Sequence, residues 1–108
     1  MRVSELKDRL GLSAAVSGAD NEVTGCYIGD LMSLAMAKLQ EGNVWITIQT
    51  NVNAVAVAVL KEAACIITAD GFILDDTALK KAESEEVTVF TSEKSAYELA
   101  KLLGELGI

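Results

Sequence analysis

Polar side chains that could bind a small anion follow three predicted strands of this chain, at the point where each strand ends. Residues 44–49, 64–68 and 87–91 are β-prone runs, and each precedes a predicted helix. In open α/β sheets, ligands bind beyond the carboxyl ends of the strands, where N–H groups at helix starts can hold a phosphate or carboxylate. The candidate ligand-binding set is therefore Thr50, Asn51, Asn53, Thr68, Asp70, Thr91 and Ser92.

The same residue types also have a purely structural explanation. Thr, Asn, Ser and Asp are favoured at helix caps and in turns without any ligand. Asn53 is expected to cap the helix after the first loop, and Ser92 is expected to cap the last helix. Asp70 and Gly71 suit a turn, in which the carboxylate would repel a nearby anion. The sequence leaves capping and ligand binding open as alternatives.

Residue types that most enzymes and metal sites use are missing from the chain. It has no histidine, which removes the usual general base at neutral pH and the commonest zinc ligand. Neither a CxxC pair nor a GxxxxGK[ST] phosphate-binding loop is present. Asp30, Asp75 and Asp76 are interpreted as helix caps rather than metal ligands. We therefore predict no catalytic residue, no metal site and no cofactor.

The N-terminal third of the chain combines a short helix with two short strands. Ser4 is expected to cap a helix over residues 5–10, which Gly11 ends. Residues 13–17 and 22–29 are predicted to be strands, which we place together at one end of a sheet.

Helices and strands alternate in the remainder of the chain. The predicted helices cover residues 31–40 with Asp30 as N-cap, 53–63, 77–85 and a last segment after Ser92. They alternate with the three strands named above, and this order is typical of a parallel sheet built from βαβ units. The sequence predicts a single α/β domain over residues 1–108, with a central, mostly parallel sheet of about five strands, flanking helices and a β-rich N-terminal end.

The helix predicted over residues 53–63 is apolar on every side, because valine and alanine alternate from 54 to 59. A helix of this kind must be covered on more than one side. The sheet covers one side, and either a second subunit or the other helices of the same chain cover the rest. We favour a homodimer. Its predicted interface residues are Met32, Met36, Val55 and Val59.

Composition and charge exclude further classes of function. The net charge of −7 repels a phosphate backbone, so we expect no nucleic-acid binding. The longest apolar run, residues 54–60, is too short for a membrane span, and we expect a cytoplasmic protein that does not bind membranes. Cys26 and Cys65 are expected to be buried free thiols, and Trp45 to be a core or interface residue.

Three stretches of the chain resemble the DRTGG domain family: "EVTGCYIGDLMSLAMAKLQEGNVWITIQTN", "AVAVLKEAACIITADG" and "VTVFTSEKSAYELAKLLGELGI". The resemblance spans nearly all of the sequence. It implies an α/β domain that is commonly dimeric and regulatory, without established catalytic activity. Such domains lie between the halves of the CBS module in regulatory pyrophosphatases, and a related fold begins HPr kinase/phosphorylase.

The motifs that give the family its name are altered here. Thr50-Asn51 stands where the family tends to have Asp-Arg, and residues 68–71, "TADG", stand where it has Thr-Gly-Gly. Lys94-Ser95 occupies the place of an Asp-Thr pair near the last helix. The charged members of the family's pocket are therefore absent from this chain.

Three hypotheses follow from the sequence. The first is a non-catalytic regulatory or interaction module, acting as a homodimer, that binds a small phosphorylated or nucleotide-like ligand or docks on a partner enzyme. The second is an enzyme or enzyme subunit acting on a phosphorylated metabolite through the strand-end threonines and Asp70 or Asp30. The third is a purely structural dimerisation domain, which predicts no pocket at the strand ends.

Overall fold

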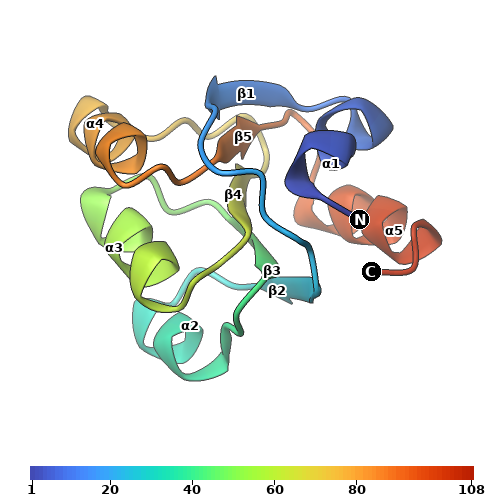
Figure 1. Cartoon of the computed structure of the whole chain (residues 1–108), viewed down its shortest axis with the longest axis horizontal. Coiled ribbons are helices and arrows are strands. Elements are labelled where there is room, and N and C mark those ends of the chain that lie inside the picture. The colour runs from blue at the N-terminus through green and yellow to red at the C-terminus, as the bar shows by residue number, and fades with distance from the viewer.

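All five residues of the strand β3 (Asn43–Thr47) are buried, which shows that both faces of the sheet are covered. Val44 and Ile46 belong to one buried cluster, whereas Trp45 between them belongs to another. Successive side chains of a strand point to opposite faces, so each cluster occupies one side of the sheet. The computed structural model describes residues 1–108 and places helices over both faces (Figure 1).

The sheet has five strands in the order β1-β5-β4-β3-β2. The strands β2 (Gly25–Ile28), β3, β4 (Cys65–Thr68) and β5 (Val89–Thr91) are parallel, whereas β1 (Ser13–Val16) pairs antiparallel with β5. The predicted fold class, an α/β domain with a mostly parallel sheet of about five strands, is confirmed.

Five helices form the two outer layers. The helices α2 (Met32–Lys38), α3 (Val52–Leu60) and α4 (Asp76–Ser84) cover one face, and α1 (Val3–Leu10) and α5 (Ala96–Glu105) cover the other (Figure 1). The longest, α5, has 10 residues, and none has the length and apolar character needed to cross a membrane. Trp45 lies in the core under the three-helix layer, fully buried, and its indole N–H donates to the carbonyl of Gly29 at 3.0 Å.

The prediction that residues 13–17 and 22–29 lie together at one end of the sheet is wrong. β1 and β2 form opposite edges of the sheet. The crossing segment, residues 17–24, connects them along the amino ends of the parallel strands and passes in front of the sheet in Figure 1. Backbone groups of Gly18, Ala19 and Thr24 hydrogen-bond to Thr88, Glu86 and Gly42 along this path. Strand propensity does not encode these long-range contacts.

The first helix begins earlier than predicted, and Ser4 is not its cap. Arg2 occupies the N-cap position, and Glu5 accepts from the Arg2 backbone N–H. Ser4 instead lies inside α1, where its N–H and hydroxyl donate to the Asp20 carboxylate at 2.8 and 2.9 Å. Asp20 belongs to the crossing segment, so it ties α1 to that segment. The predicted end of the helix at Gly11, with φ of +64°, is confirmed.

Candidate ligand site at the carboxyl ends of the strands

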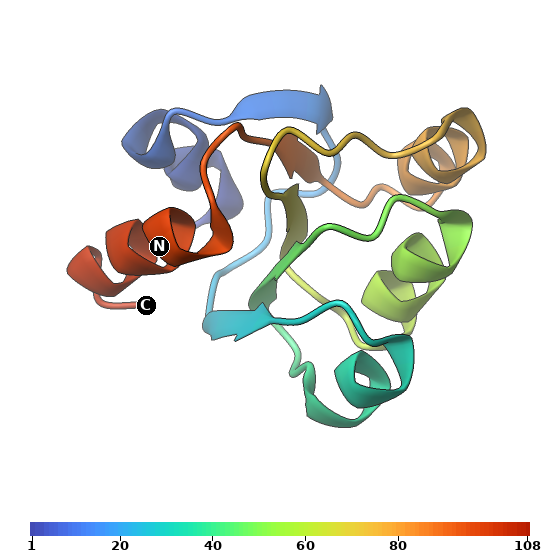
Figure 2. The ribbon, with the colours of Figure 1, turned by 180° about the vertical axis from the view of Figure 1, so that it is seen from behind.

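The carboxyl ends of β3, β4 and β5 lie along one edge of the sheet because the three strands are parallel. The connections from β3 to α3, from β4 to α4 and from β5 to α5 all cross this edge, which faces the viewer in Figure 2. The structure therefore brings all three predicted loops to the same end of the molecule. The individual side chains differ in whether they can reach a ligand.

The start of α3 has the clearest capacity to bind an anion. Asn51 is the N-cap of this helix, and its side-chain oxygen accepts from the Asn53 N–H at 2.9 Å. The prediction that Asn53 caps this helix is therefore wrong by two residues. Asn53 lies in the first turn and is exposed. The backbone N–H groups of Thr50, Asn51 and Val52 donate no hydrogen bond within the chain. Three successive donors at a helix start can be satisfied by a phosphate or carboxylate.

Thr68 and Ser92, by contrast, are used by the fold. Thr68 has no exposed surface, and its hydroxyl donates to the carbonyl of Phe90 at 3.4 Å. Ser92 is only 9% exposed, and its hydroxyl accepts from the Lys94 N–H at 3.0 Å. Ser92 is not the cap of α5, because Ser95 occupies that position and forms a capping box with Glu98. The capping prediction for Ser92 was therefore wrong by three residues.

Asp70 lies in a tight turn at the end of β4. Its φ of +55° is in the left-handed region, and its backbone N–H donates to the carbonyl of Lys94 at 2.9 Å. The next N–H, from Gly71, donates to Ser92. The Asp70 carboxylate is exposed and makes no hydrogen bond with Thr50 or with the half-buried Thr91. Asp70 therefore does not form the carboxylate–hydroxyl pair with these threonines that the enzyme hypothesis requires of it.

Asp30 has a role that its sequence position did not predict. It does not cap α2, because Leu31 occupies the N-cap position without a side-chain hydrogen bond. One oxygen of the Asp30 carboxylate accepts from the Thr47 hydroxyl and from the Ile48 N–H, both at 2.8 Å. Asp30 therefore joins the loop after β2 to the carboxyl end of β3. Parallel pairing of β2 with β3 brings these residues together, and sequence spacing does not reveal that pairing.

Exposed apolar side chains surround the same edge, and sequence reasoning did not identify them. They come from the end of β2 and from the loops and helix starts that follow the strands: Ile28, Leu31, Ile48, Phe72, Ile73 and Tyr97. Tyr97, in the first turn of α5, is the most exposed at 76%, and Phe72 is 44% exposed. The Asp75 N–H donates to the carbonyl of Thr50 at 2.9 Å, so the loop carrying Phe72 and Ile73 is held against the start of α3. An edge that carries both exposed aromatic rings and unbonded N–H groups suits a ligand with a planar ring and an anionic group.

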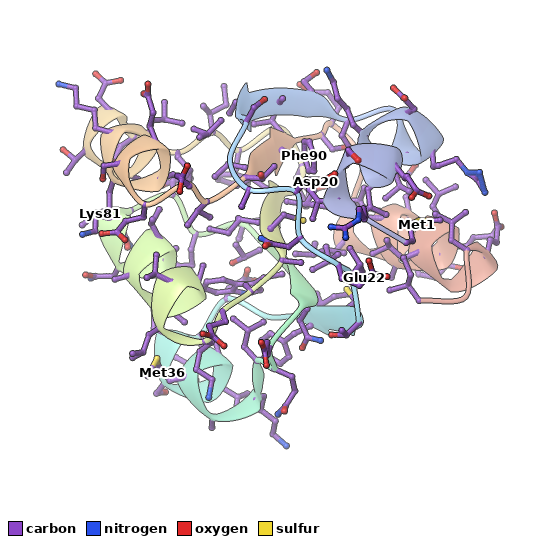
Figure 3. The ribbon with its side chains drawn as sticks, viewed as in Figure 1. Met1, Asp20, Glu22, Met36, Lys81 and Phe90 are labelled. Atoms are coloured by element: carbon purple, nitrogen blue, oxygen red, sulfur yellow. The ribbon has the colours of Figure 1, made fainter.

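The helix layer formed by α2, α3 and α4 contains the predicted dimer residues. The sheet and the neighbouring helices α2 and α4 cover α3 on several sides. Val55 is fully buried within the chain, so it has no surface to offer a partner. Met32 and Met36 are half-buried, and Val59 is 37% exposed. Met36 lies on the outward side of this layer (Figure 3).

The two cysteines lie in the same row across the sheet, on either side of β3, and both are free thiols. Cys26 on β2 and Cys65 on β4 both stand opposite Val44 of β3. Burial raises the pKa of the Cys26 thiol to about 11. Burial, and then the neighbouring Cys26, raise the pKa of Cys65 still further. Both groups are free thiols as predicted, although Cys26 is only half-buried.

Neither of the two principal cavities lies at the carboxyl edge. A cavity of about 520 Å³ opens at the amino ends of the strands, and one of about 170 Å³ lies between α1, β1 and the crossing segment. The Cys, Asp and Glu side chains form no group of three or more that could hold a metal ion. The polar and aromatic groups of the carboxyl edge therefore lie outside both of these cavities.

Comparison with known proteins relates this chain to solved structures by its fold. Neither a protein-family model nor a curated protein sequence matches the chain. Among solved structures it is similar to the CBS and DRTGG domains of the regulatory region of Clostridium perfringens pyrophosphatase, complexed with its activator diadenosine tetraphosphate, with a TM-score of 0.73 and 13% identity. The shared feature is the fold. The similarity covers 94% of this chain and 45% of the pyrophosphatase fragment.

Proposed function

We propose that this chain is a non-catalytic, DRTGG-like regulatory module that binds a small phosphorylated or nucleotide-like ligand at the carboxyl edge of its sheet. The observation that carries the proposal is the set of unbonded N–H groups of Thr50, Asn51 and Val52 at the start of α3. They supply donors and the positive end of a helix dipole in a protein with a net charge of −7. The altered Asp-Arg position, Thr50-Asn51, thus keeps a means of binding an anion through its backbone.

Aromatic side chains at the same edge of the sheet support a nucleotide-like ligand. Phe72 and Tyr97 expose their rings at the same edge, and base stacking on an aromatic side chain contributes about 1 to 3 kcal/mol. The structural relative was crystallised with an adenine dinucleotide activator, which is consistent with this ligand class. The missing histidine and the isolated Asp70 carboxylate favour ligand sensing over catalysis.

A homodimer is the second part of the proposal. The outward surface of α2 carries the half-buried Met32 and Met36, and Leu60 at the end of α3 is 68% exposed, whereas Val59 lines the cavity at the amino ends of the strands. Burying such a surface against a second copy removes apolar area from water. A regulatory module that pairs in this way can transmit ligand binding to an attached or docked enzyme. Light scattering across a concentration series tests this part, and a strict monomer at tens of micromolar would refute it.

Ligand binding is tested by thermal shift with diadenosine tetraphosphate, ATP, inorganic pyrophosphate and uncharged adenosine. A ligand at about 100 times its dissociation constant adds about 2.7 kcal/mol of stability. We expect a rise in Tm with at least one of the three anions and a smaller rise with adenosine. The absence of a shift with all three anions would refute the ligand proposal.

One substitution separates anion binding from folding. Asn51→Asp keeps a good N-cap and places a negative charge beside the unbonded N–H groups. It should leave the Tm of the free protein nearly unchanged and abolish most of the anion-dependent shift. Gln40→Glu changes the net charge equally at the opposite end of the sheet and should leave the shift intact. Equal effects of the two substitutions would contradict binding at the start of α3.

A further inference from the structure

The cavity of about 520 Å³ lies at the opposite end of the molecule from the proposed ligand site. Its walls come from the crossing segment and from the residues that end α2, α3 and α4. These elements meet at the amino ends of the parallel strands, which face the viewer in Figure 1. The cavity has the volume of a typical binding cleft and is open to solvent.

Apolar side chains contribute to the lining of this cavity. They are Ala19, Ala58, Val59, Ala63 and Val87. Ala58 and Val87 are nearly buried, whereas Val59 exposes 37% of its surface and Ala63 is half-buried. The cavity can therefore receive an apolar side chain of modest size.

Carboxylates surround this apolar surface. Five glutamates contribute to the lining: Glu22, Glu41, Glu62, Glu85 and Glu86. Glu22 pairs with the Met1 ammonium at 3.1 Å, as Figure 3 shows beside the sheet, and Glu85 pairs with Lys81 at 3.0 Å. The other three form no ion pair within the chain. A cation from outside the chain would therefore meet unpaired negative charge.

The rim of the cavity is held in place by backbone hydrogen bonds. The Gly42 N–H donates to the carbonyl of Glu62, and the Ala19 N–H donates to the carbonyl of Glu86, both at 2.9 Å. The Asn21 amide also donates to the carbonyl of Ala64 at 3.2 Å. Because these bonds fix the ends of α3 and α4 against the crossing segment, binding here needs little rearrangement.

Two of the unpaired glutamates stand directly after helix ends. Glu62 follows the C-cap of α3 and Glu86 follows that of α4, with φ values of +55° and +56°. Glycine is the usual residue in this left-handed position. The side chains lie near helix C-termini, where the helix dipole adds negative potential. The helix dipole strengthens the attraction of this rim for a positively charged partner.

We propose that this cavity, with its acidic rim, docks a basic segment of a partner protein, in which an apolar side chain is flanked by lysine or arginine. Charge complementarity argues for this occupant, since the unpaired Glu41, Glu62 and Glu86 surround the apolar lining. A second copy is disfavoured here, because each copy carries a net charge of −7 and brings the same glutamates. The docking site lies at the opposite end of the sheet from the proposed ligand site, so either proposal can fail without the other.

Fluorescence anisotropy with a labelled amphipathic peptide tests the proposal. The probe is a Leu/Lys peptide of about 14 residues, compared with a Leu/Glu peptide of the same pattern. We expect the chain to bind the basic peptide, to ignore the acidic one, and to lose affinity as salt rises. Failure of the basic peptide to bind at low salt would overturn the proposal.

Substitutions locate the binding surface. The triple variant Glu41→Gln, Glu62→Gln and Glu86→Gln should weaken peptide binding about tenfold at low salt. The control variant Asp8→Asn, Glu98→Gln and Glu105→Gln removes the same charge from α1 and α5 and should change binding less than about twofold. Equal losses in the two variants would show non-specific attraction and overturn the assignment to this cavity.

Two further measurements separate a protein segment from other occupants. Val59→Ser should weaken binding of the peptide while leaving its salt dependence unchanged, since it removes only the apolar contact. Spermidine, added at the same concentration of positive charge as the basic peptide, should compete poorly with that peptide because it lacks an apolar side chain. Full competition by spermidine together with no effect of Val59→Ser would assign the cavity to small cations and overturn the proposal. Self-association that the triple variant abolishes would instead assign it to a second copy and also overturn the proposal.

Discussion

Gly18 is the residue at which a single added methyl group should affect the fold most clearly. It lies in the crossing segment, where its N–H donates to the Thr88 hydroxyl at 2.9 Å. A Cβ atom at this position would lie 2.2 Å from the carbonyl oxygen of Glu86 and 2.8 Å from the Thr88 nitrogen. The first distance is roughly 1 Å shorter than a tolerable contact, and the neighbouring atoms are backbone. The crossing segment must therefore move away from β5 in Gly18→Ala.

The loss of folding stability expected in Gly18→Ala follows from the hydrogen bonds that this movement breaks. Displacement removes the Gly18–Thr88 bond and the adjacent Ala19–Glu86 bond, each contributing about 1 kcal/mol. Replacing glycine also restricts the unfolded chain, which offsets about 0.5 kcal/mol of the loss. The net destabilisation of Gly18→Ala is then about 1.5 kcal/mol, equivalent to a fall in Tm of roughly 6 to 12 °C for a domain of this size.

Gly104→Ala is the matched control. Gly104 lies in α5, and a Cβ atom there meets nothing within 4 Å. Because alanine favours the helix, this substitution should stabilise the protein by about 0.5 to 1 kcal/mol. Urea denaturation followed by circular dichroism measures the free energy of unfolding of both variants and of the wild type. A Gly18→Ala protein as stable as the wild type would refute the close approach of the crossing segment to Glu86.

Two further predictions concern titratable groups. Hydrogen bonds from the Ser4 backbone and hydroxyl lower the pKa of Asp20 from its ordinary value of 3.8. The contact therefore stabilises the folded protein fully above the ordinary pKa, and this stabilisation is lost as the pH falls through the lowered pKa. Asp20→Asn should therefore flatten the fall of Tm between about pH 5 and about pH 2, and an unchanged slope would contradict the contact. Because burial raises the pKa of Cys26 to about 11, native protein should react slowly with Ellman's reagent at about pH 8, Cys65 more slowly still. Both thiols should react at once in urea, and equally rapid reaction of folded protein would contradict their burial.

Local sequence patterns predicted most of the elements, because their signals lie within a few residues. The β-branched run of β3 and the capping residue Asp75 of α4 are both where the sequence placed them. The Val/Ala stretch after β3 is a helix, since a strand of that length would exceed the ordinary range. The sequence also placed the polar strand ends at one edge, which followed from predicting β3, β4 and β5 as parallel.

Capping was predicted less well because several polar residues compete for each helix start. Asn51 and Asn53 are equivalent by residue type, and only the backbone shows that Asn51 precedes the first turn. Ser4 and Asp30 lost their predicted capping roles because each bonds to a partner from a distant element. Ser4 and Asp20 are 16 residues apart in the sequence, and Asp30 and Thr47 are 17 residues apart, so local sequence patterns do not predict these contacts.

The sequence by itself determined the fold class, the order of its elements and the absence of histidine chemistry, because composition and periodicity act locally. Only the tertiary structure decided which strand-end groups are accessible: it buries Thr68 and Ser92 and leaves the N–H groups of Thr50, Asn51 and Val52 without acceptors. It also placed β1 and β2 at opposite edges, so that the crossing segment closes one side of an acidic cavity. These features depend on which distant segments pair, and pairing is set by packing of the entire core rather than by any local run of residues.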